Sequence, residues 1–211
     1  MESATRPFTV RRSTRARHVR LTVTREGDAV VVLPLRAPER AAAALVEQHG
    51  AWLDRQVARI RATRVRLDAR PTLADGRVLH VAGVPRLIAA RDTAMRDRIE
   101  RSLRAEARRL LVARVSLFAP LVGVRPTRVT VRAQRARWGS ASRAGAISLN
   151  WRLVLAPPDV LDYVVIHELS HLAVPGHSRR FWTLVRRHAP SADASRRWLR
   201  DHHAELMAAL D

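Results

Sequence analysis

Two histidines and a glutamate lie within five residues and form the pattern with the clearest chemical meaning. The segment His167-Glu168-Leu169-Ser170-His171 has the form H-E-x-x-H. On a helix, side chains four residues apart project from the same face, so the two imidazoles can bind one metal ion. Glu168 follows the first histidine and can take a proton from water at an open metal position. The spacing therefore predicts a metal centre with Glu168 as general base.

A third ligand is expected from His177, which stands six residues after His171. The proline–glycine pair directly before it ends a helix and lets the chain fold back, because proline lacks a backbone donor and glycine tolerates the turn. This spacing resembles that of metzincins, although their glycine falls where Val174 stands here. Three neutral imidazoles leave zinc a fourth position for water, so His167, His171 and His177 predict a catalytic Zn²⁺ site.

Each part of this pattern also has an interpretation without chemistry. The helix histidines and Glu168 could form a hydrogen-bonded polar cluster in a core, and His177 could be a surface residue of a turn. The metal interpretation is favoured because a buried helix does not usually hold two histidines and a glutamate without partners. His188, His202 and His203 lie on later helices without ligand spacing and are expected at the surface or at caps. His18, His49 and His80 are isolated in the sequence, and no functional role is expected for them.

The motif needs a helix to carry it, and one is expected over about residues 157–173. Two prolines and Asp159 mark its start, and apolar residues on several sides of the motif predict that it is buried. The neighbouring elements are expected as two strands, a turn-rich segment between them and two later helices: residues 128–132, 146–151, 138–145, 178–188 and 192–210. This order of elements predicts an α+β fold.

The first half of the chain mixes strand and helix patterns. Period-two alternation predicts two hairpins, with strands at residues 19–24, 29–33, 78–81 and 85–88. A helix is expected from Pro38 to Ile60, weakened in its middle by Gly50. A long amphipathic helix follows from Asp92 to Phe118 and is expected to end before Pro120.

These patterns divide the chain into two regions. Residues 1–91 form an amino-terminal hairpin and helix region, and residues 92–211 form the domain that carries the histidines. The long helix at the start of that domain has an apolar stripe that is expected to be buried: Ile99, Leu103, Leu110, Leu111 and Val115.

Charge and composition narrow the functional class. The chain has 39 basic and 19 acidic residues, a formal net charge of +20, and every basic residue is arginine. This charge favours a nucleic-acid partner, but an arginine-only composition also follows from the codon bias of a GC-rich genome. The arginines are spread along the whole chain, and an aromatic content of 4% gives no stacking platform for single strands.

The chain has no cysteine, which excludes disulfides, cysteine-ligated zinc, iron–sulfur clusters and thiol catalysis. The longest apolar run, Ala29 to Leu35, is too short to cross a bilayer, and residues 1–12 show no apolar signal region. We therefore expect a cytoplasmic protein without a membrane partner. The sequence indicates no particular oligomeric state.

Several segments around the motif together resemble the YgjP-like metallopeptidases, which are related to SprT-like and other small zincins. The matching residues are Arg137–Ser140, Ile147–Leu153, Ala156–Pro158, Asp162–Val165, His167–Leu169, His177-Ser178 and Phe181-Trp182. The resemblance implies a zincin-like catalytic domain with an amino-terminal strand and helix region packed on it, and it implies the same three ligands and the same base. The family commonly has cysteine where Ala141 stands and asparagine where Gly176 stands.

The expected activity is hydrolysis of a peptide or protein substrate. The strand at 146–150 is expected to be the sheet edge that receives an extended peptide. Asn150, Tyr163 and Arg137 are candidate supporting groups, each with a structural alternative. Two other functions stay open: a nucleic-acid-associated protein, such as a SprT-like protease acting on DNA-bound proteins, and a non-catalytic binding module stabilised by zinc. Glu168 argues against the second, because structural zinc needs no base.

Overall fold

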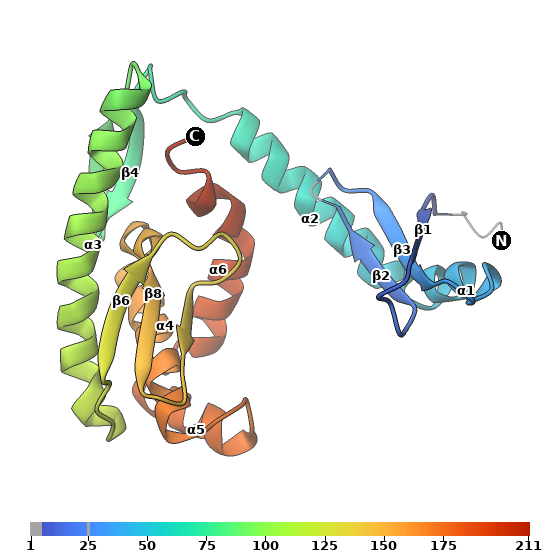
Figure 1. Ribbon diagram of the computed structural model, residues 1–211. Coiled ribbons are helices and arrows are strands. Elements are labelled where there is room, and N and C mark those ends of the chain that lie inside the picture. The colour runs from blue at the N-terminus through green and yellow to red at the C-terminus, as the bar shows by residue number, and fades with distance from the viewer. Residues whose placement is uncertain (1–5, 25) are drawn as a thin grey trace. The chain divides into compact units, whose positions relative to one another are not determined.

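Six α-helices and three small sheets make up the described residues, 6–24 and 26–211, of the computed structural model (Figure 1). The predicted α+β class is confirmed. Contacts between residues group the chain into two compact units, 1–69 and 70–211. No helix in the described part of the chain is long and apolar enough to cross a membrane.

The amino-terminal unit is organised around strand β3 (Ala29–Pro34), whose Val31 and Leu33 are fully buried. The predicted hairpin is confirmed, because β2 (Arg20–Val23) pairs antiparallel with β3. A further strand, β1 (Thr9–Ser13), pairs parallel with the other side of β3. No sequence pattern predicts β1, because four of its five residues are exposed and it has no apolar alternation.

The single helix expected over residues 38–60 is wrong. Two helices, α1 (Arg40–Gln48) and α2 (Gly50–Asp68), meet at His49, whose backbone leaves the helical region with φ −107° and ψ 18°. Gly50 lies against the Arg6 guanidinium, and a Cβ at this position would stand 2.5 Å from Arg6 Nη1. A larger residue at position 50 would therefore displace the end of the Arg6 side chain from its present position.

The carboxy-terminal unit begins with the predicted hairpin of β4 (Arg77–Val81) and β5 (Val84–Ile88), which turns at Ala82-Gly83. The sequence analysis grouped this hairpin with residues 1–91, but its contacts join it to the later chain. Ala82 N donates to Val154 O at 2.7 Å. The buried Arg77 side chain donates to the backbone oxygens of Ala208, Ala209 and Asp211 at 3.0–3.4 Å.

The long helix α3 (Thr93–Val122) is capped by Asp92, whose side chain accepts from Met95 N. It continues through Pro120, contrary to the expected end. A proline in the last turn removes a single helical hydrogen bond, and Gly123 ends the helix with a left-handed φ of 78°. Leu103, Leu111 and Val115 of the expected stripe are buried, whereas Ile99 and Leu110 are only partly buried.

The second three-stranded sheet has the order β6-β8-β7 and lies against α4. Its strands are β6 (Arg128–Arg132), β7 (Gly139–Ala141) and β8 (Ala146–Asn150). The expectation that residues 146–150 form a sheet edge is wrong, because β6 pairs parallel with one side of β8 and β7 pairs antiparallel with the other. Part of the segment predicted as a turn is thus a strand, β7, and it carries an edge that is open within the described residues.

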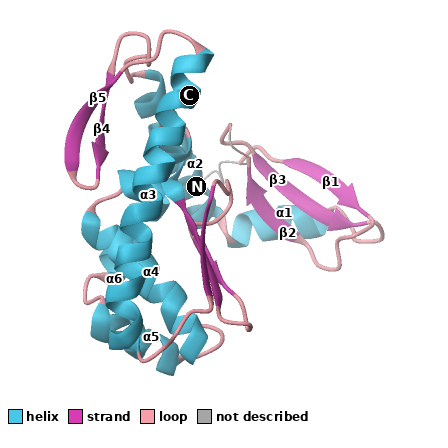
Figure 2. Cartoon of the chain, turned by 60° about the vertical axis from the view of Figure 1, so that its left-hand side comes forward, coloured by secondary structure: helices cyan, strands magenta, loops and turns pink. Residues whose placement is uncertain are grey.

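A short 3₁₀ helix, η1 (Trp151–Leu155), connects β8 to α4 (Pro158–Ala173), and α5 (Arg179–His188) and α6 (Ala192–Met207) follow. The predicted burial of α4 is confirmed, because nine of its residues are buried and it packs against α3, η1, α5, α6, β7 and β8. Figure 2 shows the sheet nearly edge-on, with α4 on one of its faces. The main core of the unit therefore surrounds the helix that carries the H-E-x-x-H segment.

Candidate metal centre

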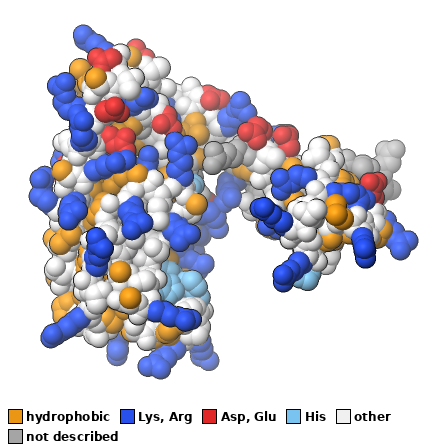
Figure 3. Space-filling view, in the orientation of Figure 1, with side chains coloured by type: hydrophobic (Ala, Val, Ile, Leu, Met, Phe, Trp, Pro, Cys, Tyr) orange, Lys and Arg blue, Asp and Glu red, His pale blue; other side chains and the backbone are white. Residues whose placement is uncertain are grey.

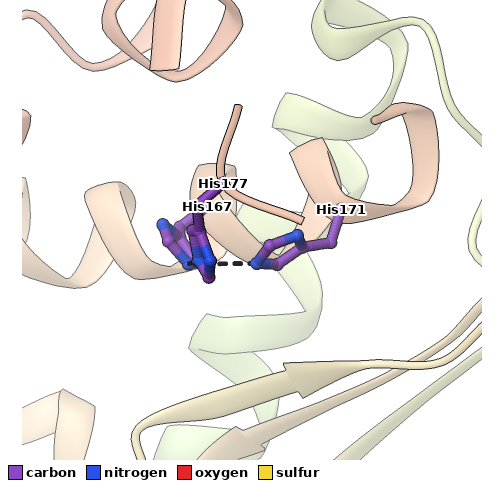
Figure 4. A group of neighbouring side chains, drawn as sticks. All are labelled: His167, His171 and His177. Carbon is purple, nitrogen blue, oxygen red and sulfur yellow. Dashed lines mark hydrogen bonds between the residues drawn. The ribbon is translucent and has the colours of Figure 1, made fainter. Parts of the chain in front are cut away.

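The two helix histidines project from one face of α4, as their spacing requires. The Nε2 atoms of His167 and His171 lie 3.2 Å apart (Figure 4). α4 begins directly after Pro157 with Pro158 in its first turn, where proline fits without loss, and the apolar residues around the histidines fix the helix in the core. The positions of both imidazoles are therefore set by the packing of α4.

His177 reaches the same point from the turn after α4. The helix ends at Ala173, and Gly176 takes a left-handed φ of 76°, which reverses the chain. Ser178 then caps α5, because its Oγ accepts from Phe181 N at 3.3 Å. These local signals bring His177 Nε2 to 3.3 Å from His167 Nε2.

The three Nε2 atoms fit one metal ion. Donor nitrogens at 2.0–2.1 Å from a tetrahedral zinc lie about 3.3–3.4 Å from one another, which follows from the geometry of the tetrahedron. The two observed separations are 3.2 and 3.3 Å, and one ring nitrogen from each histidine lies within 4.8 Å of the others. The group of His167, His171 and His177 could therefore hold a metal ion, as the sequence spacing indicates.

The electrostatic environment keeps the imidazoles of His167 and His171 in the neutral form that binds metals. Burial, followed by the charges of His171 and His177, lowers the pKa of His167 to about 3. Burial also lowers the pKa of His171, against a smaller opposing effect of a backbone hydrogen bond with Val174. A neutral imidazole has a free nitrogen lone pair, so metal binding at neutral pH does not have to displace protons from these residues.

Neighbouring side chains orient the rings. Tyr163 lies one turn before His167, and its hydroxyl stands 3.4 Å from His167 Nδ1, the nitrogen that faces away from the other histidines. Burial raises the pKa of Tyr163 to about 12, so its hydroxyl keeps its proton. Phe181 stacks on His171 and Trp182 on His177, with ring centroids 4.4 and 5.7 Å apart. Contacts of this kind hold metal ligands in orientation.

Glu168 is 7% exposed and lies beneath β7. A Cβ at Gly139 would stand 2.6 Å from Glu168 Cγ and Oε1, so the carboxylate occupies space that only glycine leaves free. Burial raises the pKa of Glu168 to about 7, against an opposing effect of the Arg137 charge. No local sequence pattern indicates the role of Gly139, because this role depends on a contact between residues far apart in the chain.

These groups share one cavity of about 780 Å³. Its lining comes from α4, from the turn that carries His177, from β7 with the turn after it, and from the segment that follows α3. The residues are Val124, Arg125, Gly139–Arg143, Gly145, His167, Glu168, His171, Leu172 and Pro175–His177. The structure thus brings together the three histidines and the glutamate singled out in the sequence.

Asn150 and the histidines outside the metal centre have contacts that serve the structure of the chain. Asn150 is fully buried, and its side chain donates to the backbone oxygens of Gln134 and Arg137 and accepts from Arg152 N. It therefore fixes the loop between β6 and β7 and does not line the cavity. The remaining histidines join no metal-binding group in the described residues; His202, for example, stacks on Trp198 with ring centroids 4.2 Å apart.

A buried helix with an H-E-x-x-H segment and a third convergent histidine defines the type of metal centre that metallopeptidases carry. The comparison with known families agrees: residues 17–94 and 82–202 match the model of the YgjP-like metallopeptidase domain. Because these matches run over most of the chain, the protein belongs to the YgjP-like metallopeptidase domain family, as the sequence resemblance implied. Neither the curated proteins nor the solved structures include a match to it.

Proposed function

We propose that this protein is a zinc-dependent metallopeptidase with His167, His171 and His177 as ligands and Glu168 as general base. The observation that carries the proposal is the convergence of three imidazole nitrogens beside a buried carboxylate in one cavity. Membership of a metallopeptidase domain family supports it.

The donor set favours zinc over harder cations. Three imidazoles suit Zn²⁺, whereas Mg²⁺ and Ca²⁺ prefer oxygen ligands. When bound, zinc supplies Lewis acidity at an open coordination position, which lowers the pKa of water and polarises a carbonyl group. The three histidines contribute the ligand nitrogens, and Tyr163 holds the ring of His167 in orientation.

Glu168 is proposed to accept the proton of the attacking water at its carboxylate and to return it to the leaving amine. Its surroundings suit this role. Among the described residues no hydrogen bond is found for its carboxyl group, so the group is available to the cavity. Burial under Gly139 limits its motion, because the backbone of β7 covers it.

The open edge of β7 is proposed to receive the substrate as an additional strand. Trp138 O and Ser142 N, at the two ends of β7, form hydrogen bonds with β8 of 2.8 and 2.9 Å. In an antiparallel pair the bonding residues alternate, so the backbone groups of Gly139 and Ala141 face away from β8. An extended peptide that pairs with them lies along the cavity that contains Glu168 and the histidines.

Metal content and cleavage together test the proposal. We expect about one zinc per chain in the wild type and in Glu168→Gln, and loss of zinc in His171→Ala. Cleavage of a mixed peptide library, followed by mass spectrometry, should disappear in Glu168→Gln with zinc retained. His80→Ala, which removes an exposed histidine of β4, is the control and should keep both properties. A wild type that takes up no zinc, or a Glu168→Gln variant that cleaves normally, would refute the proposal.

The net charge of +20 favours a second candidate, a nucleic-acid-associated role for the same protein. Binding that depends on phosphate contacts weakens steeply as salt rises. Titration of duplex and single-stranded DNA at several salt concentrations measures this slope. A steep slope with tight binding at moderate salt supports the role, and binding that vanishes at moderate salt argues for non-specific attraction.

A further inference from the structure

The cavity of the metal centre carries positive charge that the protein does not neutralise. Apart from Glu168 and the histidines, its titratable lining side chains are Arg125 and Arg143. Both are exposed, and within residues 6–24 and 26–211 neither forms a hydrogen bond or an ion pair. In Figure 3 basic side chains border the histidine patch at this end of the unit, whereas acidic side chains gather toward its other end.

The backbone holds the two arginines near one another. Arg125 follows the left-handed Gly123 at the end of α3, and Arg143 lies in the turn after β7. Thr127 joins these segments: its N–H donates to Gly145 O at 2.9 Å, and its hydroxyl donates to Ala144 O at 2.8 Å. The two guanidinium groups are therefore carried by segments that are hydrogen-bonded to each other.

Arg143 lies past the Ala141 end of β7, and Arg125 lines the same cavity from the segment before β6. A peptide that pairs with β7 and continues beyond Ala141 would run toward Arg143, and its side chains that face the cavity would meet the positive charge of both arginines. At the other end of the strand Arg137 adds positive charge close enough to Glu168 to affect its pKa. A carboxylate on the peptide gains attraction and bidentate hydrogen bonds at this location, and a basic side chain is repelled.

We propose that the site selects acidic peptides, with an aspartate or glutamate beyond the Ala141 end of β7 recognised by Arg125 and Arg143. This inference rests on the proposed function. A peptide fits better than a nucleic acid, because the edge of β7 offers backbone pairing and the cavity lining has no aromatic ring other than the histidines on which a base could stack.

Binding to zinc-loaded Glu168→Gln protein tests the inference without turnover. The probes are fluorescent extended peptides that are identical except for two central residues, which are Glu, Gln or Lys. At low salt we expect roughly fivefold tighter binding for Glu than for Gln, and weaker binding still for Lys, in line with one or two exposed ion pairs. High salt should remove most of the difference.

A charge-matched pair of variants locates the effect. Arg125→Glu with Arg143→Glu should abolish or reverse the preference for the Glu peptide. Arg101→Glu with Arg108→Glu makes the same change in net charge at exposed positions of α3 outside the cavity lining and should keep the preference. Zinc content and circular dichroism verify that each variant is folded.

The outcomes separate this inference from the function on which it rests. Equal binding or equal cleavage of the Glu and Gln peptides by zinc-loaded protein overturns the acidic preference and leaves the peptidase intact. If no peptide binds while DNA binds in an Arg125- and Arg143-dependent manner, the arginines serve nucleic acid and the inference is wrong. Absence of zinc from the wild type refutes the peptidase itself, whatever the peptides do.

Discussion

The helices α2 and α4 are of similar length, but α2 is mostly exposed and α4 is mostly buried. α4 buries nine of its 16 residues, whereas α2 buries only Gly50 and Leu53 of its 19. The histidines and Glu168 thus project from a helix that is packed on several sides, in the larger core of the chain. The candidate site therefore lies where packing fixes the positions of the ligands before a metal binds.

Zinc binding should produce the largest difference in stability between α4 and α2. At free zinc a thousandfold above its Kd, binding stabilises the folded carboxy-terminal unit by about 4 kcal/mol, because only the folded unit presents the three histidines together. Hydrogen exchange measured with and without zinc should therefore show slower exchange in α4 and unchanged exchange in α2. Equal slowing in both helices would contradict the location of the metal centre.

Gly139→Ala should displace the Glu168 side chain, which packs beneath the backbone of β7. The new Cβ meets Glu168 at 2.6 Å, so the carboxylate must move. A displacement of about 1 Å at a reacting group can cost 100-fold in rate, so we expect a loss of about that size in kcat/KM with zinc content unchanged. Arg128→Ala, at an exposed position of β6 outside the cavity lining, is the control. Normal turnover in Gly139→Ala would show that Glu168 does not need its present position.

A matched pair of valine substitutions compares the two helices directly. Val165 in α4 is fully buried, and Val65 in α2 is 68% exposed. Val165→Ala should lower the free energy of unfolding by about 2 kcal/mol, because it removes buried methyl groups and leaves a cavity. Val65→Ala should change it by less than about 0.5 kcal/mol. Urea unfolding followed by circular dichroism measures both, and similar losses would remove the distinction drawn between α2 and α4.

Tyr163→Phe tests whether a buried neighbour on α4 orients the imidazole ring of His167. The change removes the hydroxyl that lies 3.4 Å from His167 Nδ1 and keeps the aromatic packing. Loss of such a partner typically weakens metal binding by about tenfold or more, and we expect about tenfold here. Competition with a zinc chelator of known affinity measures the shift. An unchanged Kd for zinc would assign Tyr163 to packing alone.

The sequence predicted best those features that depend on neighbouring residues. α4, α5 and the hairpin of β4 and β5 follow from local periodicity, prolines and glycines. The approach of His177 to the other two histidines follows in the same way, since a helix end and one glycine turn suffice to bring them together. Local signals thus predicted the grouping of the histidines more accurately than the arrangement of the sheet.

Features that depend on distant residues were not predictable. β7 has three residues, Gly139–Ala141, without apolar alternation, and only its pairing with β8 makes it a strand. The central position of β8 requires knowledge of both neighbours. The break at His49, beside Gly50, separates two helices that a single helical pattern had joined. The requirement for glycine at position 139 follows from the burial of Glu168, 29 positions later in the numbering.

The open edge of β7 also bears on how copies of this protein behave toward one another. Exposed strand edges are sites where two chains can join their sheets and aggregate. β7 offers the backbone groups of only two residues, with Arg137 before the strand and Arg143 after it. A copy that pairs along this edge therefore brings arginine against arginine in either strand orientation. At low ionic strength the repulsion between these arginines opposes pairing of two β7 edges. Salt screens this repulsion, so rising salt should promote self-association at this strand.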